Sequence, residues 1–363
     1  MTQAPTDRPP SGCASLGTSR DRHEASGSES QRVALIVLDQ FSMIAFTSTI
    51  EPVRIANRVL GRDFYDWKTY SVDGEPVTSS NGCTLSVDGS IADLNDADIT
   101  LICSGVDVER VVLPKELGTQ LRKLNARGRT YGAVCTGAYV LARYNLLAGR
   151  RCTIHWENIR SFREEFPDID VSADLFAIDR NCITCAGGMA ALDMMLRVIA
   201  IQHGAYLAHE VAEVALYQNM RSGESAQRHD LESRTGISNV KILDAIRIMD
   251  LHIEDPLSCQ QLAMTVNLSP RQLERLFRRH FDCTPGQYYL KLRLETARDL
   301  LRRTNRAVLD VAIACGFAST SHFTKCYRER YSCTPTEERQ SYFWAPAPRK
   351  PPVRATVTQL ATS

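Results

Sequence analysis

Cys135 and His155 are the residues in this sequence whose types and spacing could support covalent chemistry. Cys135 directly follows the apolar run YGAV, and Gly132 and Gly137 leave room there for a sharp turn from a strand into a helix. Such a turn presents a thiol at a helix N-terminus, which lowers the pKa of the thiol and favours the nucleophilic thiolate. His155 could act as its general base. The pair therefore indicates a cysteine-dependent enzyme, a ligand-binding pocket, or two residues packed in a core.

Ligand binding is the interpretation that the surrounding sequence favours. No residue that would orient His155 is evident near it in the sequence. Open α/β sheets bind ligands at the carboxyl ends of their strands whether or not a reaction follows. We expect Cys135, Thr136 and His155 to line an effector pocket, and we predict no catalytic residue. A cysteine-dependent hydrolase or glyoxalase-like enzyme is the alternative.

The other cysteines do not indicate a metal site or a set of disulfides. The 12 cysteines are scattered through a long chain, and the first thirty residues lack the apolar segment of a secretory signal. Cys182 and Cys185 form one CxxC pair, with no second pair to complete a zinc site. A redox sensor that uses this pair or Cys135 is a third possibility. We predict a cytoplasmic protein with no metal and no cofactor, and no membrane span because no apolar run of about 18 residues occurs.

A basic repeat near the C-terminal end is the second chemically informative feature. Residues 256–335 contain 13 Lys and Arg against 6 Asp and Glu, whereas the whole chain has a net charge of +1. Residues 262–285 match residues 311–335, and both copies end in Cys-Thr-Pro. In each copy, apolar residues at helical spacing flank a step, begun by Asn267 or Gly316, that fits a tight turn. Each copy is predicted to be a helix-turn-helix unit whose partner is a polyanion.

The second helix of such a unit lies in the major groove, with its N-terminal side chains against base edges. We predict this helix after the cap Ser269 in the first copy and after the cap Ser319 in the second. The expected base-contacting residues of the first copy are Arg271, Glu274, Arg275 and Arg278. Those of the second copy are Thr320, Ser321, His322, Thr324, Lys325 and Arg328. Because arginine binds guanine and a carboxylate accepts from cytosine, the first copy is expected to provide most of the base discrimination.

Further basic residues lie outside these two faces. We expect them to contact phosphates, which adds affinity without sequence information. They are Arg279, Lys291, Arg293, Arg302, Arg303 and Arg306.

Two folded domains must position these groups. The β-branched runs RVALIVL, WKTYSV, DITLIC and TYGAVC alternate with helical patterns, one of them over 48–60, which predicts a parallel sheet covered on both faces. LFAIDRNCITC is typical of a hairpin, and 189–217 is expected to close the domain as helix. The predicted division is a disordered leader (1–30), an effector-sensing α/β domain (31–217), a linker (218–239), a helical DNA-binding domain (240–343) and a disordered tail (344–363).

The helical part resembles the tandem helix-turn-helix domain of AraC-type regulators. Gly316 to Arg328, GFASTSHFTKCYR, matches the signature G-F-x-S-x-S-H-F-T-K-x-Y/F-R. The resemblance implies that Arg271, Glu274 and Arg275 contact bases in one major groove of double-stranded DNA. It also implies that the next groove is contacted by Thr320, Ser321, Thr324 and Lys325.

The α/β part resembles the ThiJ/PfpI and class I glutamine-amidotransferase-like fold, a flavodoxin-like three-layer sandwich. Members with a reactive cysteine usually carry a carboxylate near the end of the first strand. The matching stretch, LDQFSMIAFTSTIEP, has apolar residues such as Ala45 there, and Glu51 stands farther along. This departure weighs against catalysis and favours an effector-sensing domain.

Together the two parts resemble the GlxA-like regulators. SMIAFTSTIEPVRIANR, CTGAYVLA, CTIHWENIRSFREEFPDI and GGMAALDMML are similar to the subgroup that responds to betaine, carnitine or arginine. The resemblance implies a small nitrogenous effector, for which Phe46 and Trp156 could supply an aromatic face. It further implies a nucleoid-associated homodimer that works with RNA polymerase, with activation as the expected direction. The enzyme alternative would carry the same DNA-binding domain.

Overall fold

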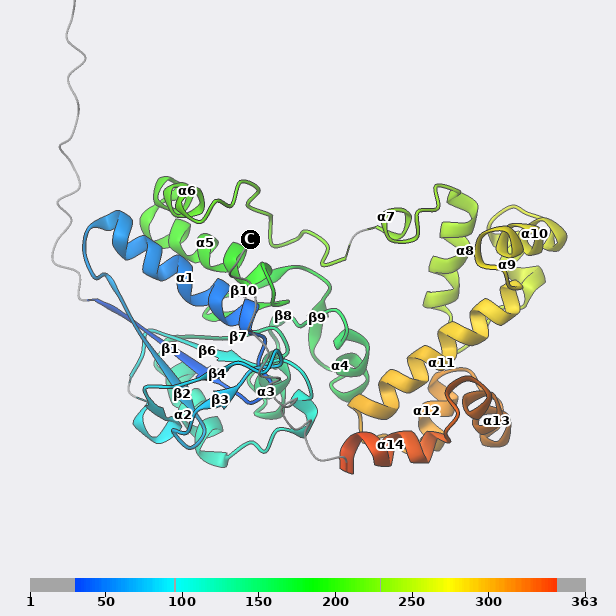
Figure 1. Ribbon diagram of the computed structural model, residues 1–363, viewed down its shortest axis with the longest axis horizontal. Helices are drawn as coiled ribbons and strands as arrows, with labels where there is room; N and C mark the ends of the chain where they lie inside the picture. Colours follow the sequence, from blue (N-terminus) through cyan, green and yellow to red (C-terminus); the bar gives the residue numbers. More distant parts are fainter. Residues whose placement is uncertain (1–29, 95, 229, 345–363) are drawn as a thin grey trace, which may run out of the picture.

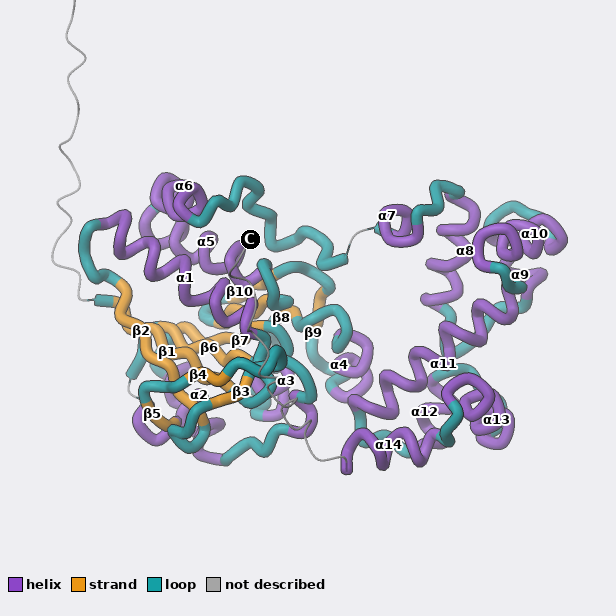
Figure 2. The backbone as a smooth tube through the Cα atoms, viewed as in Figure 1, coloured by secondary structure: helices purple, strands orange, loops and turns teal. Residues whose placement is uncertain are grey.

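The computed structural model describes residues 30–94, 96–228 and 230–344. Within these ranges the chain forms an α/β domain and a helical domain that lie side by side (Figures 1 and 2). The predicted leader and tail lie outside the described residues, apart from Ser30 and Trp344. A search of the described residues finds no helix with the length and apolar character of a membrane span.

A seven-stranded sheet forms the centre of the α/β domain. Its strand order is β10-β11-β7-β6-β1-β2-β5, and neighbouring strands are parallel except for β10 and β11. The central strand β6 is buried along its whole length, as expected of a strand covered on both faces. The strands of this sheet are β1 (Gln31–Val37), β2 (Tyr65–Ser71), β5 (Gly89–Ser90), β6 (Ile99–Cys103), β7 (Thr130–Val134), β10 (Phe176–Asp179) and β11 (Cys182–Cys185).

Helices cover both faces of the sheet and enclose two apolar cores. One core lies under α1 (Met43–Leu60), α5 (Ala190–His203) and α6 (Ala205–Val214). The other lies under α2 (Lys115–Ala126), α3 (Ala138–Arg143) and α4 (Ile159–Glu165). The predicted three-layer α/β sandwich is confirmed.

Some elements differ from the prediction. α1 begins at Met43 rather than near residue 48, and the stretch 189–217 forms two helices instead of one. Gly204, with φ of 89°, ends α5 and starts α6, because that conformation is open to glycine and breaks a helix. Elements of the α/β domain not predicted are the strand β5 and the helix α4, together with β3 (Val77–Thr78), β4 (Thr84–Leu85), β8 (Arg151–Thr153), β9 (Asp170–Ser172), η1 (Ile91–Asp93) and η2 (Val108–Arg110).

The segment that follows α6 is attached to the α/β domain. Arg221 Nη2 lies 2.7 Å from Asp193 Oδ2, and Gln227 Nε2 donates to Thr153 Oγ1 at 2.9 Å and to the Asp174 carbonyl at 2.8 Å. Half of the segment predicted as a linker therefore packs against the sheet edge instead of lying free.

The helical domain consists of two helix-turn-helix units joined by one long helix (Figure 1). Its core is formed from both units and from that helix. The confirmed units are α9–α10 and α12–α13, and α11 connects them. The helices are α7 (Leu231–Thr235), α8 (Val240–Leu251), α9 (Cys259–Thr265), α10 (Pro270–Phe281), α11 (Pro285–Arg303), α12 (Val308–Ala314), α13 (Thr320–Tyr331) and α14 (Pro335–Trp344).

Candidate nucleic-acid interface and effector site

The first candidate recognition helix is α10. Ser269 and Gln272 form a reciprocal capping box at its start, with Pro270 at the first turn. Leu273 and Phe277 are fully buried on one face, which fixes how the helix is rotated on its core. The side chains on the opposite face are therefore held toward solvent.

The four predicted base-contacting residues of α10 lie on that outer face. Arg271, Arg275 and Arg278 are exposed and Glu274 is half-buried. Arg278 Nη2 donates to Glu274 Oε1 at 3.0 Å, so these two side chains restrain each other. Arg271 and Arg275 have no ion-pair partner within the described ranges, which leaves both guanidinium groups available to an external acceptor.

The second candidate recognition helix, α13, has a more polar and less cationic outer face. Ser319 caps it by accepting from the His322 amide, and Phe323 and Tyr327 are fully buried on its inner face. The predicted residues Thr320, Ser321, His322, Lys325 and Arg328 are exposed, and Thr324 is half-buried. His322 also lies 3.3 Å from the sulfur of Cys326.

Both turns contain a residue with positive φ, as the sequence predicted. Asn267 has φ of 55° and Gly316 has φ of 71°. Asparagine and glycine adopt this left-handed conformation at the lowest cost. The turn at Gly316 is also crowded, because a Cβ there would lie 2.6 Å from Pro256 Cγ.

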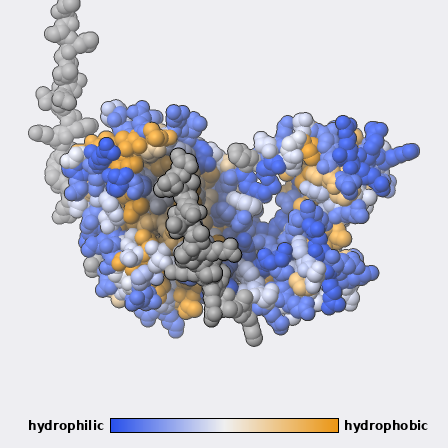
Figure 3. Space-filling model, viewed as in Figure 1, coloured by the Kyte–Doolittle hydropathy of each residue, from blue (hydrophilic) through white to orange (hydrophobic). Residues whose placement is uncertain are grey.

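α11 sets the spacing of the two recognition helices. It has 19 residues, which corresponds to roughly 28 Å of helix. Successive major-groove faces of DNA are about 34 Å apart. α10 and α13 lie beside opposite halves of α11, on the side away from the α/β domain (Figure 1). The outer surface of this domain is largely hydrophilic in the same view (Figure 3).

Most of the residues predicted to contact phosphates already bind within the protein. Arg293 donates to the carbonyls of Cys315 and Gly316, and Arg302 pairs with Glu338. Arg303 and Arg306 pair with acidic residues from several elements. These internal contacts would compete with phosphate, and phosphate contact by these four arginines stays a prediction. Arg279 is exposed, and Lys291 lies 3.8 Å from Glu295.

Cys135 lies at the sharp turn between β7 and α3, as predicted, with φ of 61°. The turn is closely packed, since a Cβ on Gly187 would lie 2.6 Å from Cys135 Cβ. The His155 amide donates to the Cys135 carbonyl at 3.3 Å, and Thr136 Oγ1 donates to the Gly105 carbonyl at 2.6 Å. The fold thus brings Cys135, Thr136 and His155 together.

The electrostatics of this turn differ from the expected nucleophile. Burial, together with the nearby Cys185, raises the pKa of Cys135 to about 12. The prediction of a lowered thiol pKa was wrong, because desolvation outweighs the helix N-terminus here. Burial also lowers the pKa of His155. Near neutral pH the pair is therefore a neutral thiol beside a neutral imidazole.

The two predicted aromatic residues have different surroundings. Phe46 is buried and packs edge-on against Phe41, with ring centroids 5.6 Å apart. Trp156 is 38% exposed, and the Arg228 guanidinium carbon lies 4.0 Å from its ring centroid. Trp156 is thus the accessible aromatic face of the two, and a cation already occupies it.

Trp156 opens into a cleft between the two domains, which the sequence did not predict. This interdomain cleft has a volume of about 810 Å³. Its walls come from the α/β domain, from the segment 226–228 and from α8 and α11 of the helical domain. The lining residues are Trp156, Glu157, Ile159, Arg160, Arg163, Glu164, Ala173, Ala226, Gln227, Arg228, Asp250, Leu292, Glu295, Thr296, Asp299 and Arg303.

Charged side chains, of which Glu109 is buried, join the domains beside this cleft. Arg303 of α11 lies 2.5 Å from Asp299, 3.7 Å from Glu109 and 3.8 Å from Glu157. Asn158 donates to Glu109 at 2.8 Å. Burial raises the pKa of Glu109 to about 7, although the nearby Arg303 lowers it.

Three polar contacts extend the interface around this cluster. Arg160 of α4 pairs with Asp250 at 2.8 Å. Arg306 pairs with Glu164 of α4, and the Tyr342 hydroxyl of α14 donates to Asp107. The interface therefore holds α4 and η2 of one domain against α11 and α14 of the other.

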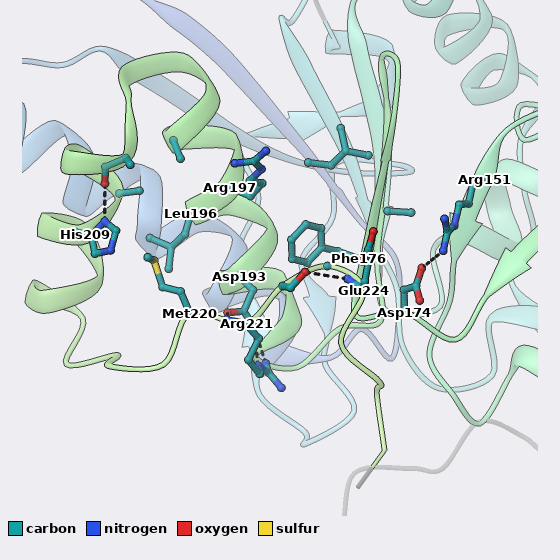
Figure 4. Close-up of a pocket in the computed structure, with 17 residues that line it drawn as sticks. Arg151, Asp174, Phe176, Asp193, Leu196, Arg197, His209, Met220, Arg221 and Glu224 are labelled. Atoms are coloured by element: carbon teal, nitrogen blue, oxygen red, sulfur yellow. Dashed lines mark hydrogen bonds and ion pairs between the residues drawn. The ribbon is translucent and has the colours of Figure 1, made fainter. Parts of the chain in front are cut away.

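A second cavity, of about 560 Å³, lies between α5, α6 and the segment 220–224 (Figure 4). Leu196, Met220 and Phe176 form apolar walls, and the Asp193 carboxylate in its floor is already bound by Arg221. None of the predicted effector residues lines it. The segment after α6 thus forms a wall of both cavities.

Comparison with known proteins gives matches to both domains. A DJ-1/PfpI family model matches residues 31–201, and a helix-turn-helix domain model matches residues 262–341. The chain is 41% identical over 310 residues to the HTH-type transcriptional regulator GbdR of Pseudomonas aeruginosa, covering 85% of this chain and 84% of that protein. It is 43% identical to the regulator CdhR of the same organism, covering 85% and 92%.

A solved structure also resembles the α/β domain. It is the crystal structure of an AraC family transcriptional regulator from Pseudomonas putida, which is 30% identical. The match covers 51% of this chain and 99% of that one, with a TM-score of 0.47.

Proposed function

Because the chain belongs to the AraC-type transcriptional regulators that combine a DJ-1/PfpI domain with a helix-turn-helix domain, we propose that a small nitrogenous metabolite controls its action on DNA. The chain is a DNA-binding transcriptional regulator. One observation supports this proposal most directly. The domain that carries the two capped recognition helices meets the α/β domain at a cleft, and the exposed Trp156 lies in that cleft.

We assign base contacts to the outer faces of α10 and α13. Arg271 and Arg275 are free of ion pairs within the described residues, and guanidinium groups bind guanine O6 and N7 in the major groove. Thr320, Ser321 and Lys325 lack the two-donor fork of a guanidinium group, so we expect α13 to tolerate more sequences. The experiment is selection of binding fragments from genomic DNA followed by footprinting. We expect one protected site that covers two successive major grooves, and protection confined to one groove would contradict the assignment.

The proposed effector class is betaine, carnitine or arginine. Each combines a quaternary ammonium or guanidinium group with a carboxylate, and an accessible tryptophan face binds such cations with about 0.5 to 2 kcal/mol per contact. Isothermal titration with betaine, carnitine, dimethylglycine and arginine tests the class. We expect at least one to bind below millimolar concentration, and binding by none would reject it.

We further propose that the regulator is a homodimer that recruits RNA polymerase and activates transcription. Exposed apolar side chains on α5, α6 and the following turn support a pairing surface, since such groups are usually covered: Ile201, Tyr206, Val214 and Leu216. Light scattering after size exclusion measures the mass, and transcription from a selected operator measures the direction. A monomeric mass or repression by the effector-bound protein would contradict the respective part.

The enzyme alternative finds no support at Cys135. A thiol with a pKa raised to about 12 is protonated near neutral pH, and the thiolate is the nucleophile. The relatives that match most of the chain are transcriptional regulators. A redox role for Cys182 and Cys185 is equally unsupported, because both are buried free thiols with raised pKa values.

A further inference from the structure

Arg228 and Trp156 form a contact whose chemistry is that of a bound cation. The guanidinium carbon of Arg228 lies 4.0 Å from the Trp156 ring centroid, the shortest such distance among the described residues. Arg228 has no carboxylate at ion-pair distance within the described part of the chain. Burial against the ring lowers its pKa, and the Trp156 ring is the partner of its guanidinium group in this contact.

The surroundings of this contact favour positive charge. Five carboxylates line the interdomain cleft, those of Glu157, Glu164, Asp250, Glu295 and Asp299. Four guanidinium groups oppose them, and Arg228 is one of these. Two of the carboxylates, Glu164 and Glu295, are already paired with cations outside the cleft lining, Arg306 and Lys291. Glu157 is adjacent to Trp156 in the sequence and is half-exposed, so it lies near the ring that holds Arg228.

We propose that the interdomain cleft is a cation site occupied by Arg228 of the chain itself, and that a small metabolite with a quaternary ammonium or guanidinium group acts by displacing the Arg228 guanidinium from Trp156. The inference rests on the proposed function, since it locates the effector and names its competitor. A quaternary ammonium or guanidinium group occupies the face of Trp156. A carboxylate on the same ligand pairs with Arg163, which lines the cleft and has only the Val171 carbonyl as partner within the described residues.

Displacement of Arg228 affects the DNA-binding domain through the chain itself. Gln227, immediately before it, is fixed to Thr153 and Asp174 by hydrogen bonds. The chain after Arg228 leads to α7 and α8 of the helical domain. Release of Arg228 thus removes a contact that fixes the chain shortly before the helical domain, and it occurs beside the Arg303 contacts with Glu157 and Glu109. A ligand that prefers the released state shifts the population toward it.

The experiment compares titrations of tetramethylammonium chloride and glycine betaine into the full chain and its variants, with sodium chloride as the ionic control. Arg228→Ala removes the competitor, so we expect both probes to bind about two- to fivefold tighter than to the wild type. Trp156→Ala removes the ring, and we expect affinity to fall by about tenfold or more. Trp156→Phe retains a ring and is expected to retain measurable binding.

Arg62→Ala is the matched control, because Arg62 also lies over an aromatic ring, 5.4 Å from the centroid of Phe64, outside the cleft. Its affinity for both probes is expected to equal that of the wild type. A second measurement is limited proteolysis: Arg228→Ala and betaine-bound wild type should be cleaved faster between residues 228 and 239 than free wild type.

Two results would overturn the inference while leaving the proposed function intact. One is equal affinity of wild type and Arg228→Ala. The other is unchanged betaine binding in a folded Trp156→Ala variant, which would place the effector at Cys135 or in the cavity of Figure 4. Failure of wild type to bind any genomic fragment would instead overturn the proposed function, because that measurement does not involve Arg228.

Discussion

Arg275 is an exposed side chain on a helix whose rotation is fixed by buried Leu273 and Phe277. Its guanidinium group has no ion-pair partner among the described residues, in contrast to Arg278, which is bound to Glu274. A free fork of donors on a rigid helix can bind a guanine without first breaking an internal contact. At the residue scale, base discrimination is therefore expected to depend more on Arg275 than on Arg278.

We predict that Arg275→Ala lowers operator affinity by about 1 to 3 kcal/mol and relaxes specificity at one base pair. Gel-shift titration against the operator and its single-base variants measures both effects. Arg279→Ala on the same helix is the control, since loss of a phosphate contact should weaken all variants about equally. An unchanged operator titration for Arg275→Ala would remove the assignment.

A second residue-scale prediction concerns Cys135. Because burial raises its pKa to about 12, the thiol remains protonated across pH 7 to 9 and should resist iodoacetamide. Exposed Cys83 and Cys259 should be alkylated first. Mass spectrometry of peptides after timed alkylation of the folded protein gives the order. Rapid modification of Cys135 at pH 7 would revive the enzyme alternative.

Patterns confined to a few neighbouring residues predicted much of this molecule. Caps, tight turns and apolar periodicity located α10, α13 and the central strands, because each depends on contacts within one or two turns of chain. The internal contact of Arg303 was not predicted, because its partner Glu109 comes from a distant part of the sequence. The position of Arg228 on Trp156 likewise has no local signal beyond a basic residue in a polar segment. The break between α5 and α6 at Gly204 did have a local sequence signal, since glycine interrupts the helical pattern.

At the scale of elements, the two helix-turn-helix units form the same tight turn with different residues. Asn267 and Gly316 both have positive φ. Gly316 is also enclosed, because the segment between α8 and α9 approaches it through Ile253 and Pro256. The second unit is therefore held against the first by packing at this glycine, and it does not behave as an independent module.

We predict that Gly316→Ala destabilises the helical domain by about 1 to 3 kcal/mol, because the new Cβ adds a clash to a strained φ. Asn267→Ala is the matched variant. It changes only the preference for positive φ, since asparagine already has a Cβ, and it should cost about 1 kcal/mol. Urea unfolding followed by circular dichroism compares them. A smaller loss for Gly316→Ala than for Asn267→Ala would contradict the crowding argument.

At the scale of the whole molecule, the contact between the domains is charged rather than apolar. Arg303 is at its centre, with the buried Glu109, the partly buried Asp299 and the exposed Glu157 around it. Interfaces of this kind are weaker than a continuous core, because desolvation offsets much of the attraction between the charges. Such an interface suits a regulator whose two domains must change their arrangement, because the binding free energy of a small metabolite is enough to offset the cost of that change.

This interface is predicted to weaken as pH rises. Burial raises the pKa of Glu109 to about 7 in the packed state, from its ordinary value of 4.5. Between about pH 4.5 and 7, Glu109 is therefore protonated in the packed state and ionised in the unpacked state. The stability that this proton gives to the packing is greatest at about pH 4.5 and is lost as the pH rises to 7. Small-angle scattering should show the radius of gyration increasing across this window. Glu109→Gln should flatten the change, and exposed Glu116→Gln should not; an unchanged slope in Glu109→Gln would contradict the prediction.

The length of α11 constrains how this regulator and its promoters can evolve. One residue inserted in α11 would rotate the second unit by about 100° and advance it by about 1.5 Å. On DNA, a rotation of that size spans about three base pairs, which advance about 10 Å along the axis. No whole number of base pairs satisfies both changes. Descendants can thus alter α10 or α13 one base contact at a time, whereas the 19 residues of α11 and the spacing of the operator are inherited together.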